Sequence, residues 1–211
     1  GSKNLTLSST AGTASQSASS YVDVSGSGIF KRELAADGAY TFPIGNGAYS
    51  PVILTFTGAG YSSAAIDVDA FNTKHSLNTS TTDYLNRYWT VNATGITGGS
   101  YNADFVYADG DFVGTESNLT LGKYDGIQWN VVGTVNTTTN TLSATGLTSF
   151  STFTGGEPGA LPIQLASFVG SYVGNSAKLE WSTVSEVNNY GFNVQRFNGV
   201  SKTYENAGFV A

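Results

Sequence analysis

Apolar and polar residues alternate with a period of two along most of the chain, which is the pattern of strands that bury one face. Leu179 and Trp181 alternate with polar residues, and Phe192 and Val194 do the same. Similar short segments occur earlier, at Tyr21–Val24, Gly28–Leu34, Ala39–Phe42, Val52–Thr57, Ala64–Ala70, Arg87–Asn92, Tyr101–Tyr107, Leu119–Tyr124, Ile127–Val132, Thr141–Thr145 and Phe150–Thr154. This spacing predicts an all-β fold, an antiparallel β-sandwich, rather than alternating strands and helices.

Turn residues separate the predicted strands. Asp37-Gly38, Asp109-Gly110-Asp111 and Asp125-Gly126 combine residue types that tolerate positive φ. We therefore expect hairpins between neighbouring strands. The composition agrees, because 26 glycines and a charged fraction of only 11% favour strands and turns over helices.

One stretch interrupts the strand pattern. The segment Gly155–Pro162 holds two of the four prolines of the chain, as expected of a domain boundary. We predict a β-sandwich domain over residues 21–154, a linker over 155–162 and a second module over 163–211. In residues 1–20, Leu5 and Leu7 have the spacing of a strand, and a Ser- and Ala-rich tether follows.

Charge and cysteine content restrict the partners. The chain has 15 acidic and 9 basic residues, a net charge of -6, which repels a phosphate backbone. We find no apolar run approaching the roughly 18 residues of a membrane span. There is no cysteine, so neither a disulfide nor a thiolate site is expected. We expect no nucleic acid, no membrane insertion and no cofactor.

Several segments of the chain carry a family resemblance. In the second module they are Leu161–Phe168, Ala177–Thr183, Glu186–Arg196 and Ala207–Val210. This region resembles the fibronectin-type-III-like module of secreted Bacteroidetes and Chlorobi surface proteins, which commonly precedes a type IX secretion sorting signal. The upstream half is similar to the region that often precedes the module, through Gly28–Arg32, Tyr40–Gly45, Tyr49–Pro51, Arg87–Thr90 and Ser149–Phe153. The resemblance implies a secreted protein, extracellular or at the cell surface.

The second module departs from a full immunoglobulin-like or fibronectin-III-like sandwich, which takes about seven strands and about 100 residues. Residues 163–211 supply only the opening strands. An incomplete sandwich exposes an apolar face and strand edges, and such a surface recruits a further strand. One interpretation is therefore strand acceptance; the other is that the chain is a fragment whose remaining strands lie elsewhere in a longer protein.

Leu5, Thr6 and Leu7 are the candidate donor strand for such an acceptor, although a C-terminal donor stays open. The candidate acceptor positions are Leu165, Phe168, Leu179, Trp181, Phe192, Val194 and Phe209. Donation from one copy to the next is a head-to-tail contact that does not close, so it generates a homopolymer. We thus predict a structural subunit of an extracellular, pilus-like filament. The alternatives are an adhesin or glycan-binding module of a larger surface protein, with surface glycans as partner, and an enzyme accessory domain.

Candidate catalytic residues are few, and we predict that the protein is not an enzyme. His75 is the only histidine, and nothing near it in sequence resembles a nucleophile elbow. Asp67 and Asp69 share a strand face, as paired carboxylates of a glycosidase would, but solvated strand faces carry such pairs more often. Trp89 and Trp129 alternate like buried positions, so we interpret both as core residues.

A calcium site is the one metal centre that the sequence offers. Asp104, Asp109, Asp111 and Glu116 could place hard oxygen donors around one hairpin end. Their spacing matches no calcium loop, and Asp109-Gly110-Asp111 also has the composition of a simple turn. The turn is the favoured interpretation.

Overall fold

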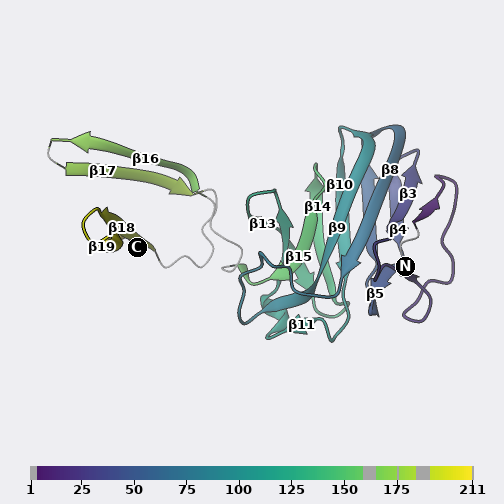
Figure 1. Ribbon diagram of the computed structural model, residues 1–211. Helices are drawn as coiled ribbons and strands as arrows, with labels where there is room; N and C mark the ends of the chain where they lie inside the picture. Colours follow the sequence, from purple (N-terminus) through teal and green to yellow (C-terminus); the bar gives the residue numbers. More distant parts are fainter. Residues whose placement is uncertain (1–3, 159–164, 175, 184–190, 211) are drawn as a thin grey trace. The chain divides into compact units, whose positions relative to one another are not determined.

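The computed structural model describes residues 4–158, 165–174, 176–183 and 191–210. The chain divides into two compact units, Gly1–Pro162 (unit 1) and Ile163–Ala211 (unit 2). In the described residues, strands make up nearly all the regular structure of both units (Figure 1), and a short 3₁₀ helix, η1, lies at Glu116–Asn118. The predicted all-β class is confirmed.

Unit 1 is built around one curled, 12-stranded sheet with the strand order β1-β3-β8-β9-β15-β12-β13-β14-β10-β7-β4, and β11 pairs with β9 at its side. The strands are β1 (Leu5–Leu7), β3 (Phe30–Leu34), β4 (Gly38–Phe42), β7 (Val52–Thr57), β8 (Gly60–Phe71), β9 (Tyr84–Thr97), β10 (Ser100–Val106), β11 (Phe112–Val113), β12 (Thr120–Tyr124), β13 (Trp129–Asn136), β14 (Thr141–Leu147) and β15 (Thr152–Gly156). A small second sheet joins β2 (Val22–Asp23), β5 (Ile44–Asn46) and β6 (Ala48–Tyr49).

Burial along the strands follows the predicted period of two. In β7, Val52, Leu54 and Phe56 are buried and the residues between them are half-buried. In β9, Leu85 and Trp89 are buried on the same face, which points into the core of unit 1. Each predicted strand segment of residues 21–154 overlaps a strand of the structure, whereas β8 and β9 run further than their apolar positions indicated.

The two ends of the curled sheet approach each other at β3 and β4. The rings of Phe30 and Phe42 meet edge to face, with centroids 6.0 Å apart. Arg32 of β3 donates through Nη1 to the carbonyl oxygen of Thr41 in β4, at 3.0 Å. The sheet thereby folds over on itself and encloses its apolar face in a sandwich-like arrangement.

The structure differs from the expected linker at its start. Strand β15 continues through Gly156, and Gly155 and Gly156 pair with Leu121 and Thr120 of β12. A Cβ at Gly155 would lie 2.8 Å from Leu85 Cγ, so this glycine allows two strands to pack closely. The glycine pair that suggested a linker is therefore part of the sheet.

Unit 2 contains two antiparallel hairpins that belong to separate sheets. The first pairs β16 (Leu165–Val173) with β17 (Ser176–Thr183), and the second pairs β18 (Phe192–Asn198) with β19 (Thr203–Val210). In the first hairpin, the register places Phe168 opposite Trp181 and Gly170 opposite Leu179, so the members of each pair lie on the same face.

Candidate functional site

The candidate donor strand lies at the edge of its own unit. Strand β1 pairs in parallel with β3, with Leu5 opposite Phe30, Thr6 opposite Lys31 and Leu7 opposite Arg32. Leu7 packs in part against the core of unit 1, while Leu5 is 43% exposed. No residue from Asn4 to Ser20 is buried. The segment thus adopts the extended conformation of a strand while contributing little to the core.

The candidate acceptor positions surround an apolar hollow in unit 2. The hollow measures about 160 Å³. Its lining is Phe168, Leu179, Trp181, Phe192, Asn193, Val194 and Gln195. Trp181 of β17 and Phe192 of β18 meet at a centroid distance of 5.6 Å, so both hairpins contribute to it. Five of the seven predicted acceptor residues are brought together here; Leu165, in β16, and Phe209, in β19, are not in the lining.

Unit 2 exposes much of its apolar surface. Phe168 is 62% exposed and Tyr172 is 89% exposed. None of the unit 2 residues whose burial the structure describes is buried. Exposed apolar patches of this kind are rare on stable monomers and mark interaction surfaces.

The calcium candidates each face a partner of their own. Asp104 accepts a hydrogen bond from Ser143 Oγ at 2.6 Å, and Asp109 accepts one from Asn140 Nδ2 at 2.5 Å. Glu116 accepts from the Tyr107 hydroxyl at 2.6 Å, which together with burial raises the pKa of Tyr107. Asp111 faces Arg87. Among the described residues, no group of three or more His, Cys, Asp or Glu side chains gathers to hold a metal ion.

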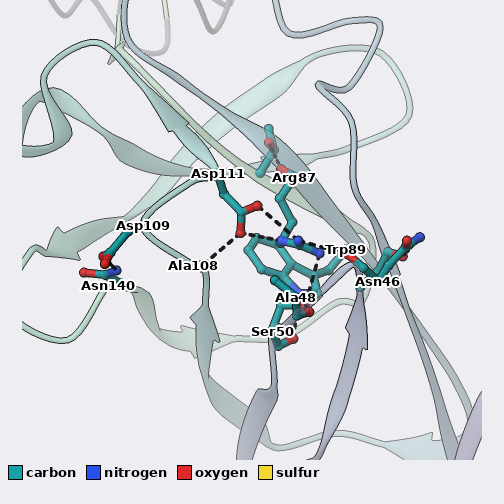
Figure 2. A network of polar contacts seen from close by, with 11 residues as sticks. Asn46, Ala48, Ser50, Arg87, Trp89, Ala108, Asp109, Asp111 and Asn140 are labelled. Atoms are coloured by element: carbon teal, nitrogen blue, oxygen red, sulfur yellow. Dashed lines mark hydrogen bonds and ion pairs between the residues drawn. The ribbon is translucent and has the colours of Figure 1, made fainter. Parts of the chain in front are cut away.

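Asp111 belongs to a buried polar network that the sequence pattern did not reveal (Figure 2). Arg87 of β9 is fully buried and donates to Asp111 through Nε at 2.6 Å and Nη2 at 3.1 Å. Nη1 donates to Ser50 Oγ and Nη2 also donates to the carbonyl oxygen of Asn46, each at 3.1 Å. Trp89 Nε1 donates to the Ser50 carbonyl oxygen at 3.1 Å. The sequence carried one sign of this network. Arg87 has the same spacing of two as the buried Leu85 and Trp89, so its side chain lies on their face of the strand.

His75 lies in an aromatic cluster on the outer face of the sheet. Its ring meets those of Tyr88 and Trp129 edge to face, at centroid distances of 4.8 and 4.9 Å. Phe71 stacks on Tyr88 at 4.4 Å. Burial lowers the pKa of His75, which favours the neutral ring. The cluster anchors the β8–β9 loop. Among the contacts described, no serine or cysteine nucleophile forms a hydrogen bond with the His75 ring.

Trp89 and Trp129 are both buried, as the alternation predicted, but in different surroundings. Trp89 lies in the main core of unit 1. Trp129 is equally hidden, at 2% exposed, but lies outside that core. Its Nε1 donates to the Leu77 carbonyl oxygen at 3.1 Å, so the loop between β8 and β9 covers it. Alternation identified a buried face without showing which element buries it.

The paired carboxylates of β8 share the outer face of the sheet, as expected. Asp67 Oδ1 lies 3.4 Å from Lys31 Nζ in a half-exposed ion pair. Asp69 accepts a hydrogen bond from the Ala70 backbone N–H at 2.7 Å. Burial raises the pKa of Asp69. Each carboxylate thus has its own partner, and both lie on the face of a strand rather than in a cleft.

Comparisons with protein-family models, with curated proteins and with solved structures found no match for this chain. In the described part of the chain, no helix is long and apolar enough to cross a membrane.

Proposed function

We propose that the protein is a structural subunit of an extracellular, pilus-like filament in which Leu5–Leu7 of one copy inserts into the hollow of unit 2 of the next. The observation that carries the proposal is that hollow, which is lined by five apolar side chains, with Asn193 and Gln195, from two hairpins of separate sheets. Strand addition is a common way to complete such a surface, because backbone hydrogen bonds supply affinity and alternate side chains fill pockets.

The donor and the hollow match in size and charge. An apolar cavity of about 150 Å³ accommodates a benzene molecule, so the hollow has room for one leucine side chain. The segment from Asn4 to Ser20 contains no charged residue, and neither does the lining of the hollow. Insertion therefore desolvates no charge, and each leucine buried contributes about 1.5–3 kcal/mol before ordering costs.

Glycan binding is a weaker candidate on this geometry. Sugar-binding faces present aromatic rings to solvent. Trp89 and Trp129 are both hidden within unit 1 and Trp181 is occupied in part by its contact with Phe192, so the exposed rings described above are those of Phe168 and Tyr172. The hollow in unit 2 has only the amides of Asn193 and Gln195 to orient hydroxyl groups, in a lining that is otherwise apolar.

Two complementary variants test the proposal. Leu5→Asp/Leu7→Asp removes the donor, and Leu179→Asp places a charge in the acceptor. We expect wild-type protein to form filaments in negative-stain electron microscopy and neither variant to do so alone. An equimolar mixture should give dimers by light scattering, since the Leu179→Asp copy can donate to the other variant but the chain cannot extend.

Thr6→Asp is the matched control for the donor, because Thr6 projects from the face opposite Leu5 and Leu7. It should assemble. Monodisperse wild-type protein at all concentrations, or filaments formed by both leucine variants, contradicts the proposal. Wild-type protein that inserts Leu5–Leu7 into its own hollow would also stay monomeric, and that result contradicts the proposal as well.

A further inference from the structure

The donor strand already has a binding site within its own unit. The Leu5 backbone N–H donates to the Ile29 carbonyl oxygen at 3.0 Å, and the Ile29 N–H donates to Asn4 Oδ1 at 3.1 Å. Arg32 donates through Nη2 to the Ala11 carbonyl oxygen at 3.0 Å and lies over the Tyr40 ring. These contacts attach both ends of the segment to the seam between β3 and β4.

The attachment is weak in packing terms. Strand β1 has only three residues and pairs along one edge. A hollow of about 280 Å³ remains beside it, with Leu5, Leu7, Tyr21, Val22, Phe30 and Pro43 among the residues that line it. Polar residues such as Thr13, Gln16 and Ser20 also line this space, so it is less apolar than the hollow of unit 2. Weakly packed edge elements belong to the low-stability end of a structure.

From these contacts we infer that the β3 edge holds the donor strand in reserve, so that release of Leu5–Leu7 from β3 must precede its insertion into another copy. The inference rests on the proposed strand donation. Its physical basis is exclusion: the same two leucines and the same backbone groups cannot occupy β3 and a neighbouring hollow together. The stored form therefore opposes assembly by the free energy needed to open it.

Release is compatible with the chain that follows the strand. Residues 8–20 carry no buried side chain, and an extended chain spans at most about 3.3–3.6 Å per residue. These residues can therefore serve as a tether once the Arg32–Ala11 hydrogen bond breaks. Release of the segment exposes the edge of β3 to solvent. The free energy gained by pairing in the acceptor must more than offset that cost.

A reversible covalent lock tests the inference. Thr6 and Lys31 are register partners in β1 and β3, and neighbouring strands lie within the Cα separation that a disulfide needs. The chain contains no cysteine, so Thr6→Cys/Lys31→Cys introduces the only pair. We expect the oxidised variant, verified by intact mass, to stay monomeric, and the reduced variant to form filaments. The Lys31→Cys single variant, kept reduced, should assemble, and the two redox forms of the double variant differ only in the disulfide.

A second variant opens the stored form without touching donor or acceptor. Arg32→Gln removes the hydrogen bond to Ala11 together with the one to Thr41. Loss of the Ala11 bond, a hydrogen bond to a charged group, should shorten the lag of assembly by about tenfold. Thermal denaturation checks that unit 1 remains folded. Assembly of the oxidised lock at the wild-type rate, or an unchanged lag in Arg32→Gln, overturns the inference while leaving strand donation intact. If wild-type protein forms no filaments, the proposed function itself fails.

Discussion

Arg87 and Asp111, 24 residues apart in sequence, form a two-point ion pair inside unit 1, with Nε–Oδ2 and Nη2–Oδ1 distances of 2.6 and 3.1 Å. The Arg87 side chain has no exposed surface and that of Asp111 is 7% exposed. Asp111 also accepts from the Ala108 backbone N–H at 2.8 Å. The pair therefore fixes the turn before β11 against β9.

Removing the carboxylate should destabilise unit 1 strongly. Asp111→Ala leaves Arg87 buried without a counter-charge, and breaking such a pair costs about 3–5 kcal/mol. Asp109→Ala is the control in the same turn, because Asp109 is exposed and bonds only the Asn140 amide in the contacts described. We expect a change below about 0.5 kcal/mol there. Urea unfolding followed by tryptophan fluorescence measures both; equal midpoints for the two variants contradict the assignment.

Stability should depend on pH through His75. Burial lowers the pKa of His75 in the folded protein, whereas an unfolded histidine titrates near about 6.5. Between the two values the unfolded chain binds more protons, so the free energy of unfolding falls as pH decreases below about 6.5. His75→Gln should remove that slope. Denaturant midpoints measured from pH 5.5 to 8 decide this, and an identical slope in the variant would exclude His75 as its source.

The carboxylates act in a lower pH range than His75. Hydrogen bonds from the Gly58 backbone N–H and from the Tyr61 hydroxyl lower the pKa of Asp37, and Asn118 and Thr115 act likewise on Asp83. Their stabilisation is present above about 3.9 and is lost as pH falls further, through the folded values. Acid unfolding should therefore show a second decline below about pH 4, which persists in His75→Gln.

Gly114 should tolerate no side chain. Its φ is +84°, and a Cβ would lie 2.1 Å from the Thr82 carbonyl oxygen and 2.2 Å from Asp83 Oδ1. Gly98 has a similar φ of +62° with no atom within 4 Å of the added Cβ. Both alanine variants carry the cost of positive φ, so the difference between their melting temperatures reports the clash. We expect Gly114→Ala to be lower by several degrees; equal melting temperatures would refute the close approach.

Calcium should leave thermal stability unchanged. Asp104, Asp109, Asp111 and Glu116 are each engaged by a separate partner, as described above. A bound ion would raise the melting temperature in proportion to its concentration over Kd. Differential scanning fluorimetry with millimolar calcium or with EGTA should give superimposable curves. A calcium-dependent shift that disappears in Asp109→Asn would instead establish a site at that turn.

The sequence by itself determined the strands and turns of this protein. A period of two is a local property, because successive side chains of an extended backbone must point to opposite faces. The spacing of Val52, Leu54 and Phe56 therefore predicted both the strand β7 and its buried face. Of the predicted Asp-Gly turns, Asp125-Gly126 connects the paired strands β12 and β13, whereas Asp37-Gly38 and Asp109-Gly110-Asp111 join strands that do not pair with each other. The hollow of unit 2 was partly predictable for the same reason, through the alternation of Leu179 with Trp181 and of Phe192 with Val194.

Only the tertiary structure decided which faces meet. The pairing of Arg87 with Asp111, the cover that the β8–β9 loop places over Trp129, and the parallel docking of β1 on β3 all join segments distant in sequence. Alternation shows that a face is buried, but many distant segments can satisfy it equally well. The choice among them depends on long-range packing and on the need to pair every buried polar group, and neither is encoded in any single stretch of the chain.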